Sequence, residues 1–393
     1  MHRHRPFHIA IVAASLRILG GQAIQAQRLL EGWRHDPAVR AWLVPINPVP
    51  PPPFDALLRV KYLRTLATQL VYWPLLFRDL RRADIVHVFS ASYASFLMSP
   101  LPAILVARAL RKPVIVHYHS GEAPDHLRRS AVARWMLGRV DLNVVPSGFL
   151  EEVFARFGLR ARIVPNTIDR ERFAFRRRSA TGEPHLLSTR NFEPLYNVAC
   201  TLRAFARVQA RCPGARLTVV GRGSQGRDLQ RLAARLGLER VTFTGAVPPD
   251  EIHRYYREAD IYVQTPLIDN MPNSVIEAFA SGLPVVATRV GGVPAILTDG
   301  VHGLLADNDD DAGVAARILT LIEDPGLARR LADAAYATCA AYDWPVVRES
   351  WLDVYRQVLR QAPRAAAESA GATGHARLVR RNGPATASPA ERA

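Results

Sequence analysis

Apolar runs of four to eight residues alternate with helix-like segments along most of the chain. The runs predict strands at residues 9–13, 85–89, 114–117, 142–145, 162–164, 186–189, 217–220, 241–244, 261–264 and 285–288. Between them, a 3.6-residue periodicity predicts helices, for example at residues 199–210, 229–236 and 274–280. Strands that are apolar throughout and are separated by helices indicate parallel sheets covered on both faces. We therefore expect an α/β protein with two sheets of five or six strands each.

A charged stretch at residues 169–183 separates the two groups of strands. It holds the run Arg176, Arg177 and Arg178, which we expect to be solvated, followed by Ser, Thr, Gly and Pro. We interpret it as a linker between a first domain at 1–168 and a second at 184–345. A helix is expected at 346–362. Residues 363–393 are rich in Ala, Arg, Gly and Pro without periodicity, which predicts a disordered tail.

Composition removes several classes of protein. Hydrophobic residues make up 49% and charged residues 22% of the 393 residues, which excludes disorder over most of the length. Cys200, Cys212 and Cys339 are too few for a disulfide scaffold and contain no Cys-x-x-Cys pair. No uncharged apolar run approaches the ~20 residues of a membrane span. The apolar run at residues 7–14 is short for a signal peptide. We expect a cytoplasmic protein.

The formal net charge of +16 is unevenly distributed. Residues 1–165 hold 22 basic and 10 acidic residues, a net of +12. Such an excess is typical of proteins that meet nucleic acid, a membrane surface or an anionic substrate. Residues 54–82, in this basic half, mix large apolar side chains with Arg59, Lys61 and Arg64. Two interpretations stay open: helices that cover a sheet, or a face that lies on a membrane surface.

The strongest chemical pattern lies at residues 265–296. Pro272, Asn273 and Ser274 are typical of a helix start, and a helix N-terminus offers free N–H groups and partial positive charge to a phosphate. Glu277 would lie one turn inside that helix, where a carboxylate can accept hydrogen bonds from ribose hydroxyls. Asp269, on the preceding loop, would reach sugar hydroxyls beyond the phosphates.

Two further features point to the same kind of ligand. Gly221, Gly223 and Gly226 follow a strand and open a helix, although a lone Gly-x-Gly pattern is weak evidence and also fits a plain tight turn. Arg190 follows another predicted strand. Open α/β sheets bind ligands at that end of their strands.

Together these residues resemble the family 4 glycosyltransferases, over roughly residues 7–362. That family has the GT-B fold, in which two Rossmann-like domains face each other across a cleft. In the second half the resemblance rests on Arg190, the run VVGRG, Phe243-Thr244-Gly245, the carboxylate pair Asp269 and Glu277, the run GLPVV and Gly291-Gly292. In the first half it rests on Gly20-Gly21, His119, VVPSGFLEEVF and VPNTID.

The resemblance implies a metal-independent hexosyltransferase that uses no cofactor and moves a sugar from a nucleotide sugar, UDP- or GDP-hexose, with retention. The first domain would bind the acceptor and the second the donor, and a helix at residues 344–359 would cross back to the first domain. Catalytic roles would fall to His119, Asp269 and Arg190. The donor-binding residues would be Gly20, Gly21, Arg190, Tyr196, Gly221, Gly223, Asn273, Ser274, Val275 and Glu277.

The sequence departs from the family pattern in three places. Tyr196 lies nearest to the position of a lysine that usually helps the arginine neutralise the diphosphate. Asp269 stands where a glutamate is usual, and Ala295 replaces the second acidic group after Gly291-Gly292. One lost electrostatic contact can cost on the order of 10²–10³ in rate. A non-catalytic sugar-nucleotide or glycan-binding protein and a nucleotide-sugar epimerase on the same fold therefore remain alternatives.

Other chemistry is less well supported. The run from Asp307 to Asp311 has metal-ligand spacing, but it precedes a helical pattern, so helix capping explains it. His117, His119 and His126 lack zinc-ligand spacing, and no recognition module for nucleic acid appears. The expected partners are a nucleotide sugar, a glycan or lipid-linked acceptor of cell-envelope or exopolysaccharide synthesis, and the anionic inner face of a membrane, which the protein would touch peripherally.

Overall fold

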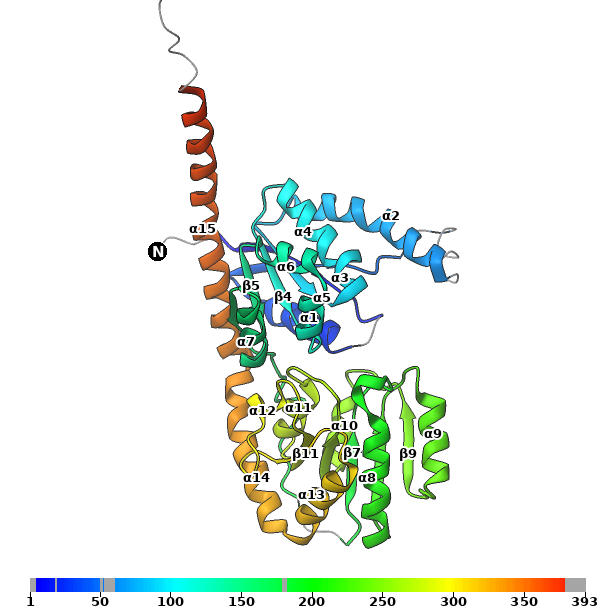
Figure 1. The fold of residues 1–393 in the computed structure, drawn as a ribbon. Helices are drawn as coiled ribbons and strands as arrows, with labels where there is room; N and C mark the ends of the chain where they lie inside the picture. Colours follow the sequence, from blue (N-terminus) through cyan, green and yellow to red (C-terminus); the bar gives the residue numbers. More distant parts are fainter. Residues whose placement is uncertain (1–4, 18–19, 50–51, 53–60, 179–181, 379–393) are drawn as a thin grey trace, which may run out of the picture.

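Two six-stranded parallel sheets, each covered by helices on both faces, make up most of the molecule (Figure 1). The computed structural model describes residues 5–17, 20–49, 52, 61–178 and 182–378, with backbone alone at 61–62 and 362–378. The expected α/β architecture with two Rossmann-like sheets is confirmed.

The first sheet has the strand order β2-β1-β3-β4-β5-β6. Its strands are β1 (Phe7–Ala13), β2 (Val39–Pro45), β3 (Ile85–Ser90), β4 (Val114–Tyr118), β5 (Leu142–Val145) and β6 (Ala161–Ile163). Its helices are α1 (Gly21–Trp33), α2 (Lys61–Leu80), α3 (Tyr93–Met98), α4 (Pro100–Ala109), α5 (Ala123–Arg129), α6 (Ala131–Leu137) and α7 (Gly148–Arg156). Strand β2 is not among the predicted ones. It lies at the sheet edge with most side chains half-buried, and its apolar residues 41–44 were not singled out as a strand.

The second sheet has the order β12-β11-β10-β7-β8-β9. Its strands are β7 (His185–Ser188), β8 (Arg216–Val220), β9 (Val241–Gly245), β10 (Ile261–Gln264), β11 (Val285–Thr288) and β12 (Leu304–Ala306). Its helices are α8 (Val198–Arg211), α9 (Gly226–Arg235), α10 (Ile252–Glu258), α11 (Asn273–Ala280), α12 (Val293–Ile296), α13 (Asp311–Glu323) and α14 (Pro325–Thr338). Short 3₁₀ turns lie at Pro194–Tyr196 and Cys339–Tyr342. The three-residue edge strand β12 was also not predicted, because it is too short for a periodicity signal.

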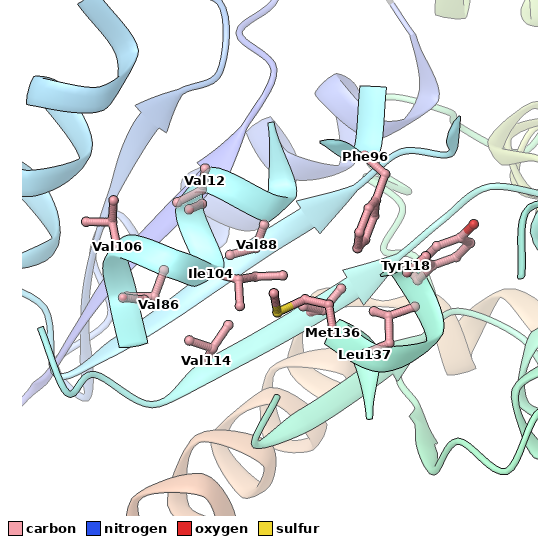
Figure 2. Close-up of a cluster of buried hydrophobic side chains, with 14 of the residues drawn as sticks. Val12, Val86, Val88, Phe96, Ile104, Val106, Val114, Tyr118, Met136 and Leu137 are labelled. Carbon is pink, nitrogen blue, oxygen red and sulfur yellow. The ribbon is translucent and has the colours of Figure 1, made fainter. Parts of the chain in front are cut away.

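Alternation along the strands divides the first domain's core into two layers. Ala10 and Val12 of β1 face one way, toward α2 and α4, whereas Ile9 and Ile11 face α1 and the last helix. Figure 2 shows the first of these layers, where Ile104 of α4 packs beside Val86 and Val88. The sheet is apolar on both faces because helices cover both, as expected for a parallel sheet.

A long helix, α15 (Trp344–Leu378), follows the second domain and runs along the first (Figure 1). Trp351 and Tyr355 are buried against the first sheet. The composition predicted a disordered tail from residue 363, but the helix continues through Leu378. Adding residues to an existing helix needs no new nucleus, and alanine has the highest helix propensity. Residues 379–393, the rest of the predicted tail, lie outside the described residues.

The linker arginine Arg178 is not the solvated side chain that the sequence suggests. Its guanidinium donates to the carbonyls of Ala259 and Tyr256, at 3.1 and 2.8 Å, and to that of Ser281. These carbonyls belong to the C-terminal ends of α10 and α11, where cations are favourable. Arg178 therefore fixes the position of α11, the helix that carries Glu277.

Candidate active site in the interdomain cleft

A cleft of about 850 Å³ opens between the carboxyl ends of the two sheets and is lined by residues from both domains. It brings together ten of the twelve residues that the sequence singled out: Gly20, Gly21, His119, Arg190, Tyr196, Gly221, Asp269, Asn273, Ser274 and Glu277. Gly223 and Val275 do not line it. Val275 is fully buried in the second domain's core, and its N–H donates to the carbonyl of Pro272.

Arg190 is the centre of the polar network on the second domain's side. It lies just after β7, with only 9% of its surface exposed. Its guanidinium donates to Asp269 at 2.6 Å and to the Ser274 hydroxyl at 3.2 Å. The Tyr196 ring lies 4.1 Å from the guanidinium carbon, a cation–π contact. Burial, the largest single effect, lowers the pKa of Arg190. The Asp269 carboxylate and the nearby tyrosines Tyr196, Tyr262 and Tyr256 together outweigh it, so the net shift is upward.

Two carboxylates line the cleft beside α11: Asp269, on the loop before the helix, belongs to the Arg190 network, whereas Glu277, within the helix, has other partners. Besides Arg190, Asp269 accepts a hydrogen bond of 2.9 Å from the N–H of Asn270. Glu277, 7% exposed, accepts hydrogen bonds at one oxygen from Arg28 of the first domain, at 2.7 Å, and at the other from the Tyr256 hydroxyl, at 2.9 Å. Each carboxylate oxygen has two acceptor positions, so Glu277 can accept more.

The predicted helix start at Pro272 is confirmed. Pro272 precedes α11, and no side chain caps the helix. The N–H groups of Asn273 and Ser274 are among those that a helix cannot pair internally. The side-chain oxygen Oδ1 of Asn273 accepts hydrogen bonds from the side-chain amides of Gln25 and Asn166, both at 2.9 Å. The free end of α11 thus faces the cleft while its first side chain ties the domains together.

The glycines hold loops against each other. A Cβ on Gly291, whose φ is +50°, would lie 1.9 Å from the carbonyl oxygen of Asp269. A Cβ on Gly221, whose φ is +155°, would lie 2.2 Å from the carbonyl oxygen of Arg190. No side chain fits at either contact. These two glycines therefore let neighbouring loops pack directly behind Asp269 and Arg190.

His119 follows β4 and lines the cleft from the first domain. Its ring stacks on Phe89, with centroids 5.1 Å apart, and lies 4.0 Å from His117. Burial lowers the pKa of His119 to about 3, so it is neutral at physiological pH. His117 in turn lies 3.3 Å from His87, nitrogen to nitrogen, and His87 lies 3.1 Å from the Tyr355 hydroxyl of α15. A row of neutral imidazoles thus connects the cleft with the crossing helix.

Several residues that join the domains at this site were not predicted. Arg28 and Gln25 lie on α1 and contact Glu277 and Asn273 of the other domain. Gly21, which was predicted to bind the donor, also accepts a hydrogen bond of 3.4 Å at its carbonyl from the Asn273 side-chain amide. The sequence spacing of residues within one domain does not predict these pairs, because each pair joins residues of different domains. The runs VVPSGFLEEVF and VPNTID did contain two more of them, since Ser147 donates to Asn270 and Asn166 donates to Asn273.

The aspartate run at the start of α13 has structural partners. Asp310 accepts a hydrogen bond of 2.8 Å from the N–H of Gly313 and caps the helix, which confirms the capping prediction. Asp309 and Asp311 form ion pairs with Arg203, at 2.9 and 3.3 Å. Among the described residues, no cluster of His, Cys, Asp and Glu has a geometry that could hold a metal ion.

Comparisons with known proteins identify the family of the chain. The family model described as Glycosyltransferase Family 4 matches residues 20–172, and the one described as Glycosyl transferases group 1 matches residues 169–338. The chain is 30% identical over 280 residues to the D-inositol 3-phosphate glycosyltransferase of Nocardia farcinica, which covers 66% of this chain and 62% of that protein. It is 27% identical over 308 residues to the sulfoquinovosyl transferase of Arabidopsis thaliana, covering 72% and 59%. The match thus spans about three fifths of each relative's length.

Solved structures show the same fold at low sequence identity. The Anabaena protein HepE, crystallised with UDP and glucose, has a TM-score of 0.68 at 19% identity, with 88% of this chain and 99% of that chain covered. Sucrose-phosphate synthase from Thermosynechococcus elongatus has a TM-score of 0.70 at 20% identity, with 90% and 100% covered. The two family models overlap at residues 169–172 and together span residues 20–338, which hold every strand except β1 and nearly all of the cleft lining. The chain therefore belongs to the family 4 glycosyltransferases and has their GT-B fold.

Proposed function

We propose that this protein transfers a hexose from a nucleoside diphosphate sugar to a hydroxyl of a glycan or lipid-linked acceptor, with retention at the anomeric carbon. The observation that carries the proposal is the meeting of Arg190, the free start of α11 and two carboxylates in one cleft. Fixed positive groups aimed at a departing diphosphate are the largest contribution that such a site can make to the rate.

The diphosphate would lie between Arg190 and the N–H groups at the start of α11. No lysine lines the described cleft, but Arg222 lies there beside Gly221, exposed and outside every ion pair found among the described residues. We assign Arg222 as the second cation that partly replaces the usual lysine. Glu277 would accept hydrogen bonds from the ribose with its remaining lone pairs. His119 and Asp269 would orient the transferred sugar.

The contacts of Asp269 favour a front-face displacement. Arg190 holds one of its oxygens and the N–H of Asn270 the other, so this carboxylate is fixed as a hydrogen-bond partner rather than as a free nucleophile. The bond from the anomeric carbon to the diphosphate breaks while the bond to the acceptor oxygen forms on the same face. The acceptor's proton passes to the departing phosphate oxygen. Positioning and charge stabilisation then account for the catalysis.

The crystal structures of HepE contain UDP, UDP-glucose, or UDP with glucose, and these neighbours support UDP-hexose as the first donor to test. A thermal-shift screen against UDP-, GDP- and ADP-sugars tests the proposal directly. A ligand at 100 times its dissociation constant adds ~2.7 kcal/mol to stability. Release of the nucleoside diphosphate in the presence of acceptors would distinguish a transferase from a protein that only binds the donor. Binding without release would favour the non-catalytic alternative, which the Tyr196 replacement motivates.

The first domain would also lie on an anionic membrane surface. One side of α2 packs on α4 through buried Tyr72, Leu76 and Leu80. A second side presents an exposed apolar stripe, here called the α2 stripe: Leu63, Leu66, Leu70, Trp73 and Phe77. Its members recur at intervals of three and four residues, and Leu66 and Leu70 are 59% and 68% exposed. A helix that only covers a sheet would carry polar residues on its outer side, so a regular stripe of exposed apolar side chains indicates a second binding surface.

Charge and position support a lipid surface as the partner. Exposed Arg64 and Arg78 lie on the same helix, and Arg81 and Arg82 follow it directly. Helix α2 lies on the side of the first domain away from the second (Figure 1). Among the described residues no helix is long and apolar enough to cross a bilayer. Apolar insertion plus basic flanks is the pattern of an interfacial helix. Residues 54–60 of the predicted amphipathic stretch lie outside the described residues.

A further inference from the structure

The first domain's wall of the cleft carries unexpected charges. The domain as a whole is strongly basic, yet its charged side chains among the described cleft residues are Arg28, Glu31 and Glu122. Arg28 is paired with Glu277. His119, the histidine on this wall, is neutral because burial lowers its pKa to about 3. With Arg28 paired to the other domain, the acceptor side of the cleft keeps two carboxylates, Glu31 and Glu122, and no free cation among its described residues. The donor side has carboxylates too, Asp250, Asp269 and Glu277, but it also carries the cations Arg190 and Arg222.

The carboxylate of Glu122 lies on this wall and takes no part in the hydrogen bonds and ion pairs of the donor site. Among the described residues its carboxylate forms no hydrogen bond and no ion pair. The neighbouring Gly121 lies against the other domain, since a Cβ there would be 3.1 Å from the backbone of Asp269. Glu122 therefore stands where the acceptor wall meets the loop that we assign to the transferred sugar.

The Glu122 carboxylate contributes to raising the pKa of two tyrosines, one from each domain. Burial, hydrogen bonding to Asp125 and the Glu122 carboxylate raise the pKa of Tyr93 to about 12. Burial also raises the pKa of Tyr196, against the opposing effect of Arg190 and with added contributions from Asp269 and Glu122. Tyr196 contacts Arg190, which we assign to the diphosphate. Glu122 therefore lies near the expected diphosphate site, but among the described residues it forms no ion pair with a cation.

Tyr93 adds a second, independent sign of a binding site. It lines the cleft, is 36% exposed, and has a φ of +54°, which is unusual for a residue with a side chain. Its hydroxyl donates to Asp125 at 2.7 Å, and its ring packs on His126 with centroids 5.3 Å apart. Strained residues of this kind gather at functional sites. The surroundings thus hold Tyr93 beside Glu122 despite the backbone cost.

We propose that Glu122 binds hydroxyl groups of an uncharged acceptor sugar, and that this wall rejects acceptors that carry a phosphate there. The inference rests on the proposed transferase function and names its acceptor class. An ionised carboxylate accepts hydrogen bonds from hydroxyls and offers none. A phosphate placed beside Glu122 would meet like charge with no free cation on the same wall. A lipid-linked acceptor fits if its phosphate stays outside the cleft while its sugar enters.

The test uses the full chain, the sugar nucleotide selected by thermal shift, and matched acceptors. Octyl glucoside, octyl galactoside and octyl mannoside form the neutral set, and the same glycosides with a phosphate at carbon 6 form the charged set. Release of the nucleoside diphosphate is measured with each acceptor and with water alone. The variants are Glu122→Ala, Glu122→Lys and, as a control, Glu151→Gln, an exposed carboxylate on α7 outside the cleft.

We expect the wild type to prefer the neutral set. Glu122→Ala should lower kcat/KM for those acceptors by about ten- to a hundred-fold, the range for a lost hydrogen bond to a charged group. Donor affinity and donor hydrolysis by water should stay unchanged, which a structural collapse of the cleft would not allow. Glu122→Lys should shift the preference toward the phosphorylated set, and Glu151→Gln should behave as the wild type.

Three results would overturn the proposal: a wild-type preference for phosphorylated acceptors, unchanged acceptor kcat/KM in Glu122→Ala, or donor hydrolysis without transfer to either set. A wild type that binds no sugar nucleotide at all would instead contradict the proposed transferase function. The two failures are therefore distinguishable.

Discussion

Arg28 of the first domain donates a hydrogen bond of 2.7 Å to Glu277 of the second domain, and both side chains are nearly buried. Glu277 is the carboxylate that we assign to the donor ribose. Its position and charge therefore depend on the domain that would bind the acceptor. Gln25 and Asn166, which hold Asn273, extend the same connection to the start of α11.

Removing Arg28 should destabilise the protein strongly. Arg28→Ala leaves the Glu277 carboxylate buried without its cation, and breaking a buried pair in this way costs about 3–5 kcal/mol. Urea unfolding of Arg28→Ala, Glu277→Gln and the double variant gives the coupling between the two residues. Arg231→Ala, which breaks an exposed pair with Asp228, is the matched control and should change stability little. Additive effects in the cycle would show that the contact carries no coupling.

Donor binding should depend on Arg190, Glu277 and Arg222. Isothermal titration with UDP, or with the nucleotide that the thermal-shift screen selects, should show a loss of about 1.5–3 kcal/mol for Arg190→Ala and for Glu277→Ala. Arg222→Ala should weaken binding less, because that side chain is exposed. The control is Arg227→Ala on the outer surface of α9. If the Arg190 and Glu277 variants both bind as the wild type does, the donor site is wrongly assigned.

Turnover should survive chelation of divalent metal ions. The positive charge at the diphosphate would come from Arg190 and the start of α11, and the aspartates before α13 are used for capping and for ion pairs with Arg203. Activity is measured before and after EDTA, and again after adding manganese. Activity that EDTA abolishes and manganese restores would contradict the metal-free mechanism.

Stability should fall as the pH drops below about 6.5. Burial, followed by the neighbouring His119, lowers the pKa of His87 to about 3 in the folded protein. Between that value and about 6.5 the unfolded chain binds a proton that the folded chain does not, so the free energy of unfolding decreases with falling pH. At pH 5 this one histidine accounts for a loss of about 2 kcal/mol.

Urea unfolding at pH 7 and pH 5 measures this dependence. His87→Gln cannot take up the proton, so its stability should change less with pH, even if it starts lower because the contact with Tyr355 is altered. His35→Gln, at an exposed position, should keep the wild-type dependence. An identical pH dependence in His87→Gln and the wild type would remove His87 as the cause.

The α2 stripe should direct the protein to anionic vesicles. In sedimentation with phosphatidylserine-containing liposomes we expect binding at low salt, weaker binding at high salt, and none to neutral vesicles. Each basic residue near such a surface contributes ~1 kcal/mol. Changing Leu66 and Leu70 together to serine, or Arg64 and Arg81 to glutamate, should reduce binding. Val301→Ser, on the second domain, should not. Wild-type protein that stays in the supernatant at low salt would leave a soluble acceptor or a partner protein as the better explanation.

What the sequence determined by itself is local. Most strands consist mainly of apolar residues, so ten of the twelve strands, including β10 and β11, could be found from their own composition. Pro272 before α11 and Asp310 before α13 have the chemistry of helix starts, and both are where the sequence places them. Arg190, Asp269 and Glu277 could be singled out because a phosphate and a ribose need these groups at strand and helix ends.

The tertiary structure decided which distant groups meet. Nothing near Arg28 in the chain points to Glu277, 249 residues away, and Glu122 becomes notable only because its wall of the cleft holds no free cation. From the sequence, Arg178 was expected to be a solvated linker residue. In the structure its guanidinium donates to carbonyls at the C-terminal ends of two helices. Helix α2 has apolar residues on two of its sides. Packing against α4 determines which side is buried and which forms the exposed α2 stripe. The periodicity of apolar residues predicts which side of a helix or strand is buried. Which residue packs against that side depends on how the elements and the two domains pack together.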